Sequence, residues 1–400
     1  MNFLRDYLNG TANAHSLDQA EKVTRVNYEG RRAIEWNALN GDITAVYIVE
    51  VSRGPNWWLG LDENGPQNDI ISNLPERVKE KIRNKELMLI ILSDTEEYHV
   101  DIHENHLDII FKAMSDNRLP AGSVVIASAA FDTKVYEQYC KKHGRMIQMF
   151  YGTMRDRFVN SREETSVEKA ISYSFSRDFN SLNHTNYFRP HVTYHAYTLL
   201  VNNFIKRGLV SLNKYVDERN GDEPSNIHAY FPPMQDKVYN KLMSKYYPRS
   251  IDFEIDDLIV NQKPDETNIP YDIYNASLLT FVNETNVNSP TVLSEKIFKP
   301  IAAGQPFIYV GAAGSLSRLK QLGYTVDMLD IDTSYDDIDD NAERVMAANK
   351  ELIKWVKKPR ATKIELITES LPNIKRNQMI EQMNSRLMNE ITKQARKYFK

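Results

Sequence analysis

The chain has 400 residues, 42% of them hydrophobic, and a formal net charge of −4, which are ordinary values for a globular protein large enough for two domains. The slightly negative charge excludes an overall basic nucleic-acid binder, but it does not exclude a local basic groove. Cys140 is the only cysteine, so an intramolecular disulfide and a four-cysteine zinc site are excluded. No signal segment and no bilayer-spanning apolar run is visible, so we expect a cytoplasmic protein without a membrane partner.

The first half of the chain alternates between strand and helix patterns. After an amphipathic helix predicted over residues 16–26, strands are predicted over residues 43–51, 87–92, 123–128 and 146–150. Helical patterns over residues 75–85, 106–117 and 133–143 separate these strands. Continuous apolar runs such as LMLIIL are typical of strands in a parallel sheet. The sequence therefore predicts an α/β fold with a mainly parallel sheet.

A polar stretch ends this half, and we place the domain boundary near Phe175. In the second half, strands are predicted over residues 179–182 and 208–212, and helices over residues 194–206, 237–246 and 342–356. A long helix is predicted over residues 373–399, with an apolar stripe formed by Ile380, Met383, Leu387 and Ile391. The predicted domains are residues 1–175 and 176–372, followed by a C-terminal helix over residues 373–400.

Residues 278–324 form the most informative stretch of the sequence. They predict a strand over residues 278–282, a helix that begins at Ser294 and is strained or shortened by Pro300, a second strand over residues 307–310 and a second helix over residues 315–322. In such a unit, ligands bind beyond the carboxyl ends of the strands and against helix N-termini.

Five residues of this stretch fall near that binding edge: Glu284, Ser294, Glu295, Lys296 and Gly311. A carboxylate can accept hydrogen bonds from a ribose diol, whereas a lysine and free helix N–H groups can hold a diphosphate. This chemistry suits a nucleotide-sugar donor. The alternative is a generic α/β unit with capped helices and no nucleotide.

An ordered series of residues in this stretch resembles the donor-binding segment of fucosyltransferase-like glycosyltransferases, and resembles a group of phage and giant-virus glycosyltransferases more closely. The matching residues are Glu284-Thr285, Ser294-Glu295-Lys296, Phe298-Lys299-Pro300, Gly304-Gln305-Pro306-Phe307-Ile308 and Gly311. The resemblance implies two Rossmann-like domains facing a cleft, the GT-B arrangement. It places the donor in the C-terminal domain and the acceptor in the N-terminal domain.

A second segment with the same resemblance contains the strand at residues 179–182 and then Arg189, Pro190 and His191. The resemblance implies that Arg189 contacts the donor diphosphate, and a guanidinium can bind phosphate in a bidentate manner. The chain departs from the family pattern at Val192, where a second basic residue is usual. An arginine paired with a loop acid is the alternative for Arg189, and we interpret His191 as a structural histidine.

Candidates for the catalytic base follow the buried strand at residues 87–92. Asp94 and Glu97 lie where a carboxylate would face the cleft between domains, and the related viral enzymes often have an acid there. A solvated acidic loop is the alternative. Asp330-Ile331-Asp332 matches a DxD metal motif, but it lies late in the chain in an acidic segment, so we interpret it as surface and expect no metal and no cofactor.

These observations predict a metal-independent glycosyltransferase that moves a hexosyl or pentosyl group from a nucleotide-diphosphate sugar to an acceptor hydroxyl. The acceptors open to such a phage-type enzyme in a host cytoplasm are 5-hydroxymethylcytosine in DNA, a glycan or a protein. The competing class is a non-catalytic protein of the same fold that binds a nucleotide or a partner. P-loop, dinucleotide-binding, zinc-protease and hydrolase motifs are missing from the sequence.

Overall fold

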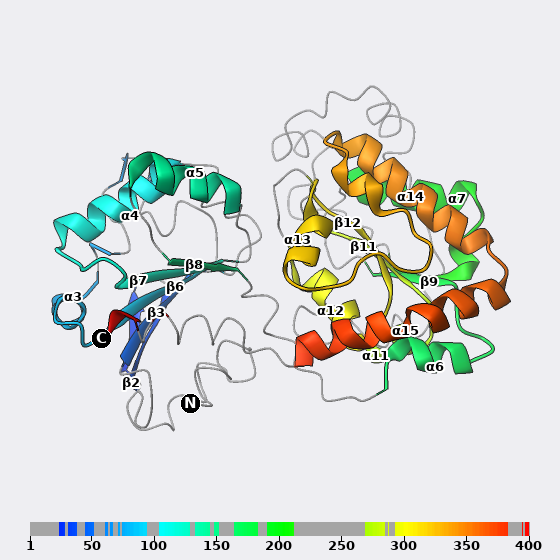
Figure 1. The fold of residues 1–400 in the computed structure, drawn as a ribbon, viewed down its shortest axis with the longest axis horizontal. Helices are drawn as coiled ribbons and strands as arrows, with labels where there is room; N and C mark the ends of the chain where they lie inside the picture. Colours follow the sequence, from blue (N-terminus) through cyan, green and yellow to red (C-terminus); the bar gives the residue numbers. More distant parts are fainter. Residues whose placement is uncertain are drawn as a thin grey trace, which may run out of the picture. The chain divides into compact units, whose positions relative to one another are not determined.

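A computed structural model describes residues 71–93 except 73, 104–128, 133–144, 148–151, 164–182, 190–211, 269–284, 287, 293–382, 394 and 397–399. It also describes the strands at 24–28, 31–37, 45–51, 61–62 and 65–66. The fold is mixed α/β with parallel sheets (Figure 1). The chain divides into two compact units, the first made of Met1–Val159, Ser289–Ser294 and Met383–Lys400, and the second of Asn160–Asn288 and Glu295–Gln382.

The first unit contains a six-stranded sheet with the order β1-β2-β3-β6-β7-β8. The first two strands pair in antiparallel fashion, and the last four strands run parallel. The strands are β1 Thr24–Tyr28, β2 Arg31–Asn37, β3 Ala45–Val51, β6 Met88–Ser93, β7 Val124–Ser128 and β8 Gln148–Tyr151. A separate pair is formed by β4 Leu61–Asp62 and β5 Gly65–Pro66.

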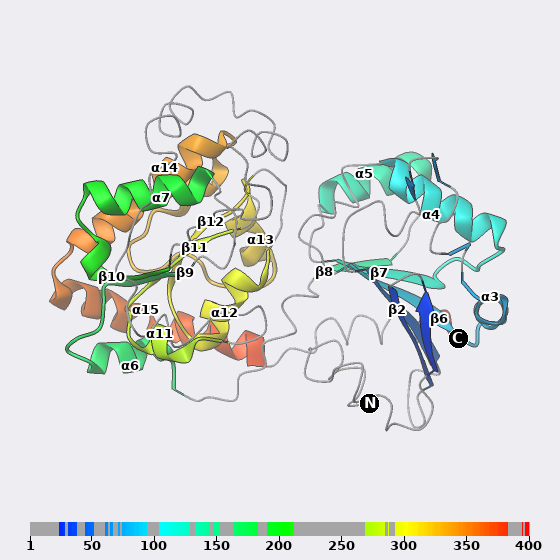
Figure 2. The same ribbon diagram turned by 180° about the vertical axis from the view of Figure 1, so that it is seen from behind.

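Three helices connect the parallel strands of this unit: α3 Glu76–Arg83, α4 Glu104–Asp116 and α5 Thr133–His143. Both views place α4 and α5 on the same side of β6, β7 and β8 (Figures 1 and 2). The buried residues of β6 are all apolar. This agrees with the interpretation of the LMLIIL run as a strand inside a parallel sheet. The strands and helices predicted for this part are confirmed to within a few residues.

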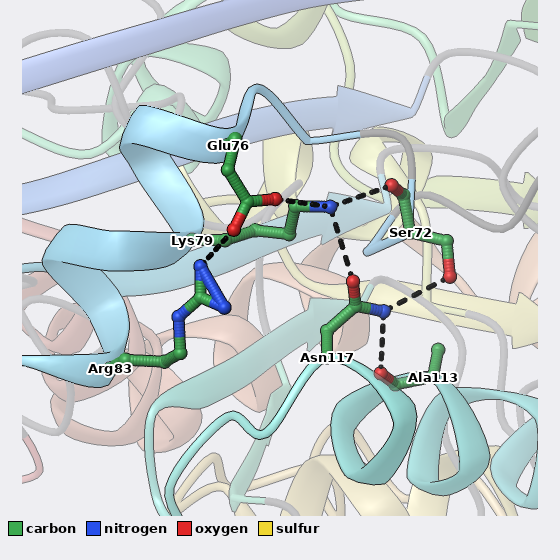
Figure 3. Close-up of polar contacts among 6 residues, drawn as sticks. All are labelled: Ser72, Glu76, Lys79, Arg83, Ala113 and Asn117. Carbon is green, nitrogen blue, oxygen red and sulfur yellow. Dashed lines mark hydrogen bonds and ion pairs between the residues drawn. The ribbon is translucent and has the colours of Figure 1, made fainter.

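Polar side chains join the start of α3 to the end of α4 (Figure 3). Lys79 Nζ donates to the carbonyl of Ser72 and to Oδ1 of Asn117, both at 3.1 Å, and pairs with Glu76 at 3.1 Å. Asn117 Nδ2 donates to the carbonyl of Ala113 at 2.8 Å and to Ser72 Oγ at 3.1 Å. The network therefore ties the start of α3 to the end of α4, and we interpret it as structural.

The last described residues of the chain belong to this first unit. Tyr398 is buried, and its hydroxyl donates to the carbonyl of Ile82 at 2.6 Å.

The long helix α15 runs from Arg360 to Gln382, so it begins earlier than the predicted residue 373. Pro372 is tolerated inside it. Of the predicted stripe, only Ile380 lies among the described residues.

The second unit contains a four-stranded parallel sheet with the order β10-β9-β11-β12. The strands are β9 Phe179–Leu182, β10 Gly208–Ser211, β11 Thr280–Asn283 and β12 Phe307–Val310. The chain passes from β9 outward to β10 and from β11 outward to β12 in the opposite direction. The strand order therefore reverses between β9 and β11, which is the place where open parallel sheets bind ligands.

Helices cover both faces of this sheet, which is why every residue of β9, β11 and β12 is buried. In both views, one face bears α7 Pro190–Val201 and α14 Asn341–Lys357 (Figures 1 and 2). The other face bears α6 Ser166–Ser172, α11 Tyr271–Asn275, α12 Glu295–Ala303 and α15. The remaining elements are α13 Ser315–Gln321 and the 3-10 turns η3 Ile205–Arg207 and η5 Thr333–Asp337.

The boundary between the units differs from the predicted position near Phe175, because α6 belongs to the second unit. Thr165 begins α6 with a capping box, in which its side chain accepts from the Glu168 N–H and the Glu168 carboxylate accepts from the Thr165 N–H. The Val167 N–H donates to the carbonyl of Gly304 at 3.4 Å, just past the end of α12. The polar composition of this stretch concealed these contacts.

Two other predictions need correction. The helix over residues 16–26 is wrong for residues 24–26, which lie in β1 because Thr24 and Val26 are β-branched and pair with β2. Pro300 does not shorten α12, which continues to Ala303. The helix over residues 237–246 lies outside the described residues. No described helix is long and apolar enough to cross a membrane.

Candidate functional site

The candidate site lies at the carboxyl ends of β11 and β12, beside the point where the strand order reverses. Glu284 directly follows β11 and is fully buried. Its backbone N–H donates to the carbonyl of Val310 at 2.8 Å, which continues the pairing between β11 and β12. Its carbonyl lies 2.7 Å from Nε2 of His191 in the first turn of α7. The main chain of Glu284 is therefore fixed from two sides.

The carboxylate of Glu284 has partners from two elements. Tyr309 of β12 donates its hydroxyl hydrogen to Oε2 at 2.9 Å. Lys296 of α12 brings Nζ to 3.8 Å from Oε1. Lys296 also donates to Oε1 of the neighbouring Glu295 at 3.0 Å. The three charged side chains Glu284, Glu295 and Lys296 therefore meet at one place, with side chains only 0%, 4% and 6% exposed.

The electrostatics of this cluster keep Glu295 ionised. Burial by itself would raise the pKa of the Glu295 carboxyl, but the charge and hydrogen bond of Lys296 and the charge of Lys299 together lower that pKa to about 2. Lys299 lies one helical turn after Glu295 on α12 and is also fully buried. Two carboxylates and two ammonium groups therefore balance one another inside the unit, and this balance offsets much of their desolvation cost.

The turn that contains Gly311 makes structural contacts, and its predicted contact with a donor stays a prediction. A Cβ atom at Gly311 would lie 2.4 Å from Cε1 of the Tyr309 ring, so the glycine makes room for that ring. The carbonyl of Gly311 accepts from Nε of the buried Arg344 at 2.9 Å. Arg344 also donates to the carbonyl of Val287 at 2.8 Å. The contacts seen for Gly311 are thus structural.

The N-terminus of α13, which follows this turn, already holds an anion of the protein itself. The carboxylate of Asp336 accepts from the backbone N–H groups of Leu316 and Ser317, each at 3.0 Å. Tyr335, the preceding residue, accepts from the N–H of Tyr309 at 3.3 Å. The acidic segment after the second helix therefore serves to cap α13 and to support β12. A diphosphate would not reach these two N–H groups without displacing Asp336.

The DxD sequence lies on the surface, as predicted. The Asp330 side chain is 74% exposed and pairs with Lys358 at 3.2 Å. Asp332 caps η5 by accepting from the N–H of Ser334 at 3.0 Å. Among the described residues, no group of three or more His, Cys, Asp or Glu side chains gathers as a metal site would require.

The structure thus brings together three of the predicted site residues, Glu284, Glu295 and Lys296. Ser294 is buried and directly precedes α12, as its predicted capping position requires. Arg189, Asp94 and Glu97 lie outside the described residues, so their predicted roles stay predictions. His191 makes the structural contact expected of it.

Sequence reasoning missed Tyr309 and Lys299. The signal for Lys299 was available, because positions 295 and 299 are four apart on a helix and their side chains are neighbours. Tyr309 gave a weaker signal: a single hydroxyl in the apolar strand FIYV, next to a strand that is followed by an acid. Its partner became visible only from the register, which places Asn283 opposite Val310.

In comparisons with known proteins, no protein-family model and no curated protein matches the chain.

Proposed function

We propose that the chain is a nucleotide-sugar-dependent glycosyltransferase whose donor binds at the cluster of Glu284, Glu295, Lys296 and Lys299. The observation that supports this proposal best is the position of the cluster. Four buried ionisable groups gather at the carboxyl edge of a parallel sheet, beside the reversal of strand order where such sheets bind nucleotides. Clustered ionisable groups with perturbed pKa values are typical of functional sites.

Three charged groups of the cluster contact the donor in this proposal. Lys296 and Lys299 neutralise the donor diphosphate, together with Arg189, which precedes α7 in the sequence. Glu295 accepts hydrogen bonds from the ribose hydroxyls. In the free protein, Lys296 is held at 3.0 Å by Glu295. A diphosphate would replace that carboxylate as the partner of the ammonium group, and would leave Glu295 available for the ribose.

The reaction itself follows from the chemistry of glycosyl transfer. The acceptor hydroxyl oxygen forms a bond to the anomeric carbon while the bond from that carbon to the diphosphate oxygen breaks. The hydroxyl proton passes to a carboxylate, for which Asp94 and Glu97 remain the candidates, and the charge left on the diphosphate is stabilised by the lysines. The proposal includes a GT-B arrangement, in which the first unit supplies the acceptor side.

A thermal-shift screen tests the donor site. The protein is titrated with UDP, GDP, CMP, UDP-glucose, GDP-sugars and a pentose donor, because a ligand that binds only the folded state raises the melting temperature. At a ligand concentration about 100 times Kd, the stabilisation is about 2.7 kcal/mol. The absence of a shift with every nucleotide at millimolar concentration would contradict the proposal.

The variants are chosen so that lost binding is not confused with lost folding. Lys296→Ala alone removes a cation that neutralises two buried carboxylates. Removing one partner of a buried ion pair lowers the free energy of unfolding by about 3–5 kcal/mol, so this variant could lose binding by unfolding. The double variant Glu295→Gln, Lys296→Met keeps both volumes and removes one charge of each sign. We expect it to fold and to lose the nucleotide-induced shift. Lys320→Ala, which removes an exposed lysine paired with Asp327, is the matched control and should keep that shift.

Acceptor assays then separate the remaining alternatives. The donor that produces a shift is offered with DNA containing 5-hydroxymethylcytosine, with unmodified DNA and with glycans, and sugar transfer is measured by mass spectrometry. Transfer to one of them identifies the acceptor class. Nucleotide binding without transfer or donor hydrolysis would favour a non-catalytic nucleotide-binding protein of the same fold.

A further inference from the structure

Two aromatic side chains are exposed on the second unit, just after α6. Tyr173 and Phe175 stack with ring centroids 5.2 Å apart and ring planes 11° from parallel. Tyr173 is 40% exposed and Phe175 is 70% exposed, although apolar rings of this size are usually buried. The stack presents aromatic surface to solvent, on which another flat ring can lie.

Basic residues lie near the backbone of this segment. Arg360 donates to the carbonyls of Tyr173 at 2.7 Å and Ser176 at 3.2 Å. Arg177 lies two residues after Phe175 and donates to the carbonyl of Lys206 at 3.2 Å. The neighbouring Arg207 and Lys206 are exposed. These hydrogen bonds therefore place all of these cations in the same region.

One acid lies among these cations. Asp178 pairs with Arg207 at 2.6 Å and with the buried Lys363 at 2.5 Å. Five cations and one carboxylate make the local charge +4, in a chain whose formal net charge is −4. Burial is the main cause that lowers the pKa of Lys363; Asp178 opposes this effect, and the positive charges of Arg207 and Arg360 add to it.

This surface is distinct from the proposed donor site. Asp178 directly precedes β9 and Arg207 directly precedes β10, so both lie at the amino ends of these parallel strands. The charged cluster around Glu284 lies at the carboxyl ends of the same sheet. A ligand held by the aromatic pair would therefore bind at the opposite edge of the sheet.

We propose that Tyr173, Phe175, Arg177, Lys206 and Arg207 form a binding surface for single-stranded nucleic acid. Phosphates are attracted by the exposed cations, and a base stacks on the outer face of the aromatic pair. This combination of positive charge and open aromatic rings is how proteins hold single strands with little sequence preference. An acidic peptide would use the cations but would gain nothing from the flat rings.

Fluorescence anisotropy with labelled oligo(dT) at low salt tests this surface. We expect binding whose logarithmic affinity falls against the logarithm of salt concentration with a slope of about −2, from roughly 0.7 per phosphate contact and three exposed cations. Phe175→Ala should weaken binding by about 5- to 150-fold, the range for one lost base stack. Lys206→Glu should weaken binding and reduce the salt slope.

Met379→Ala is the matched control, because Met379 is 54% exposed but lies near the other end of α15 from Arg360. It should bind oligo(dT) as the unchanged chain does. Three results would overturn the proposal: no binding at low salt, unchanged binding in both Phe175→Ala and Lys206→Glu, or competition by polyglutamate as strong as by unlabelled oligo(dT). The last result would indicate an acidic-peptide surface. None of these results depends on the donor site, which is tested separately by nucleotides.

Discussion

The hydroxyl of Tyr309 donates to Oε2 of Glu284 at 2.9 Å, and this bond determines which carboxylate oxygen faces Lys296. The other oxygen, Oε1, lies 3.8 Å from the ammonium group. The ring that supplies the hydroxyl occupies the space where a Cβ of residue 311 would lie. The turn after β12 therefore determines the position of a charged group after β11: Gly311 leaves room for the Tyr309 ring, and the Tyr309 hydroxyl holds the Glu284 carboxylate.

Tyr309→Phe should weaken nucleotide binding while leaving the fold intact. The variant keeps the ring and removes only the hydrogen bond to the carboxylate, which is of the charge-assisted kind, worth about 1.5–3 kcal/mol. That amount is expected as lost stability, and we expect nucleotide affinity to fall as well because Glu284 is no longer held in its place beside Lys296. Isothermal titration with the nucleotide that gives the largest thermal shift measures this loss, and circular dichroism checks the fold.

Gly311→Ala should reproduce the effect of Tyr309→Phe, because the added methyl group displaces the ring. The double variant should be little worse than either single variant, since both act on one bond. Tyr335→Phe is the control: it removes a hydroxyl that accepts from the backbone N–H of Tyr309 and has no contact with Glu284 in the described part of the chain, so it should lower stability and leave nucleotide affinity unchanged. Equal loss of affinity in all three single variants would argue against a specific role for the Tyr309 hydroxyl.

Gly304→Ala should be much more destabilising than Gly314→Ala. Both glycines have left-handed backbone angles, with φ +69 at Gly304 and φ +80 at Gly314, and this conformation costs an alanine about 1–2 kcal/mol. At Gly304 the new Cβ would also lie 2.6 Å from Cβ of Thr165, whereas nothing lies within 4 Å at Gly314. Urea denaturation of both variants measures the difference. Equal losses would show that α6 moves aside without cost.

The sequence predicted the alternation of strands and helices well, because that alternation is a local property. The apolar run at residues 307–310 is short and is bounded by Pro306 and Gly311, which favours a strand, and Gly304 ends α12. The proximity of two members of the candidate cluster was predictable for the same reason. Glu295 and Lys296 are adjacent in the chain, so their proximity needed no tertiary information.

What the sequence could not show depends on contacts between distant residues. Asp336 is twenty residues after Leu316, yet it caps the helix that begins there, and nothing in an acidic stretch indicates which carboxylate does this. Tyr309 reaches Glu284 only because β11 and β12 pair in one register. The polar stretch around Thr165 packs against the end of α12 because Gly304 leaves room for it, which composition does not reveal.

Asp336→Ala should destabilise the second unit through α13. The substitution removes both hydrogen bonds to the helix N-terminus, and losing such a cap costs about 0.5–2 kcal/mol. Asp336→Asn keeps an acceptor oxygen and should cost less. Asp332→Ala, which removes the exposed cap of η5, is the control and should have the smallest effect in urea denaturation. If Asp332→Ala were the most destabilising of the three, the capping role of Asp336 would be refuted.

His195 should make the protein less stable as the pH falls from 6.5 to about 4. Its ring stacks on Phe281 with centroids 4.1 Å apart, and Nδ1 donates to Oδ1 of Asn349 at 2.9 Å, since the amide nitrogen of Asn349 donates elsewhere. Burial lowers the pKa of His195 from 6.5 to about 4, although the bond to Asn349 opposes this effect. As the pH falls, His195 is protonated in the unfolded chain before it is protonated in the folded protein. Its contribution to the free energy of unfolding is therefore fully present above pH 6.5 and falls by about 3 kcal/mol towards pH 4.

His195→Phe keeps the stack and removes the titrating group, so urea denaturation across this pH range should show a flatter profile. At neutral pH the variant should be less stable by about 1–3 kcal/mol, because Asn349 loses the partner of a buried oxygen. Glu295→Gln is the matched control. The pKa of Glu295 is lowered from 4.5 to about 2, so its contribution is lost only below pH 4.5, and the variant should keep the slope above that value. A His195→Phe variant with an unchanged slope would assign the acid sensitivity to another group.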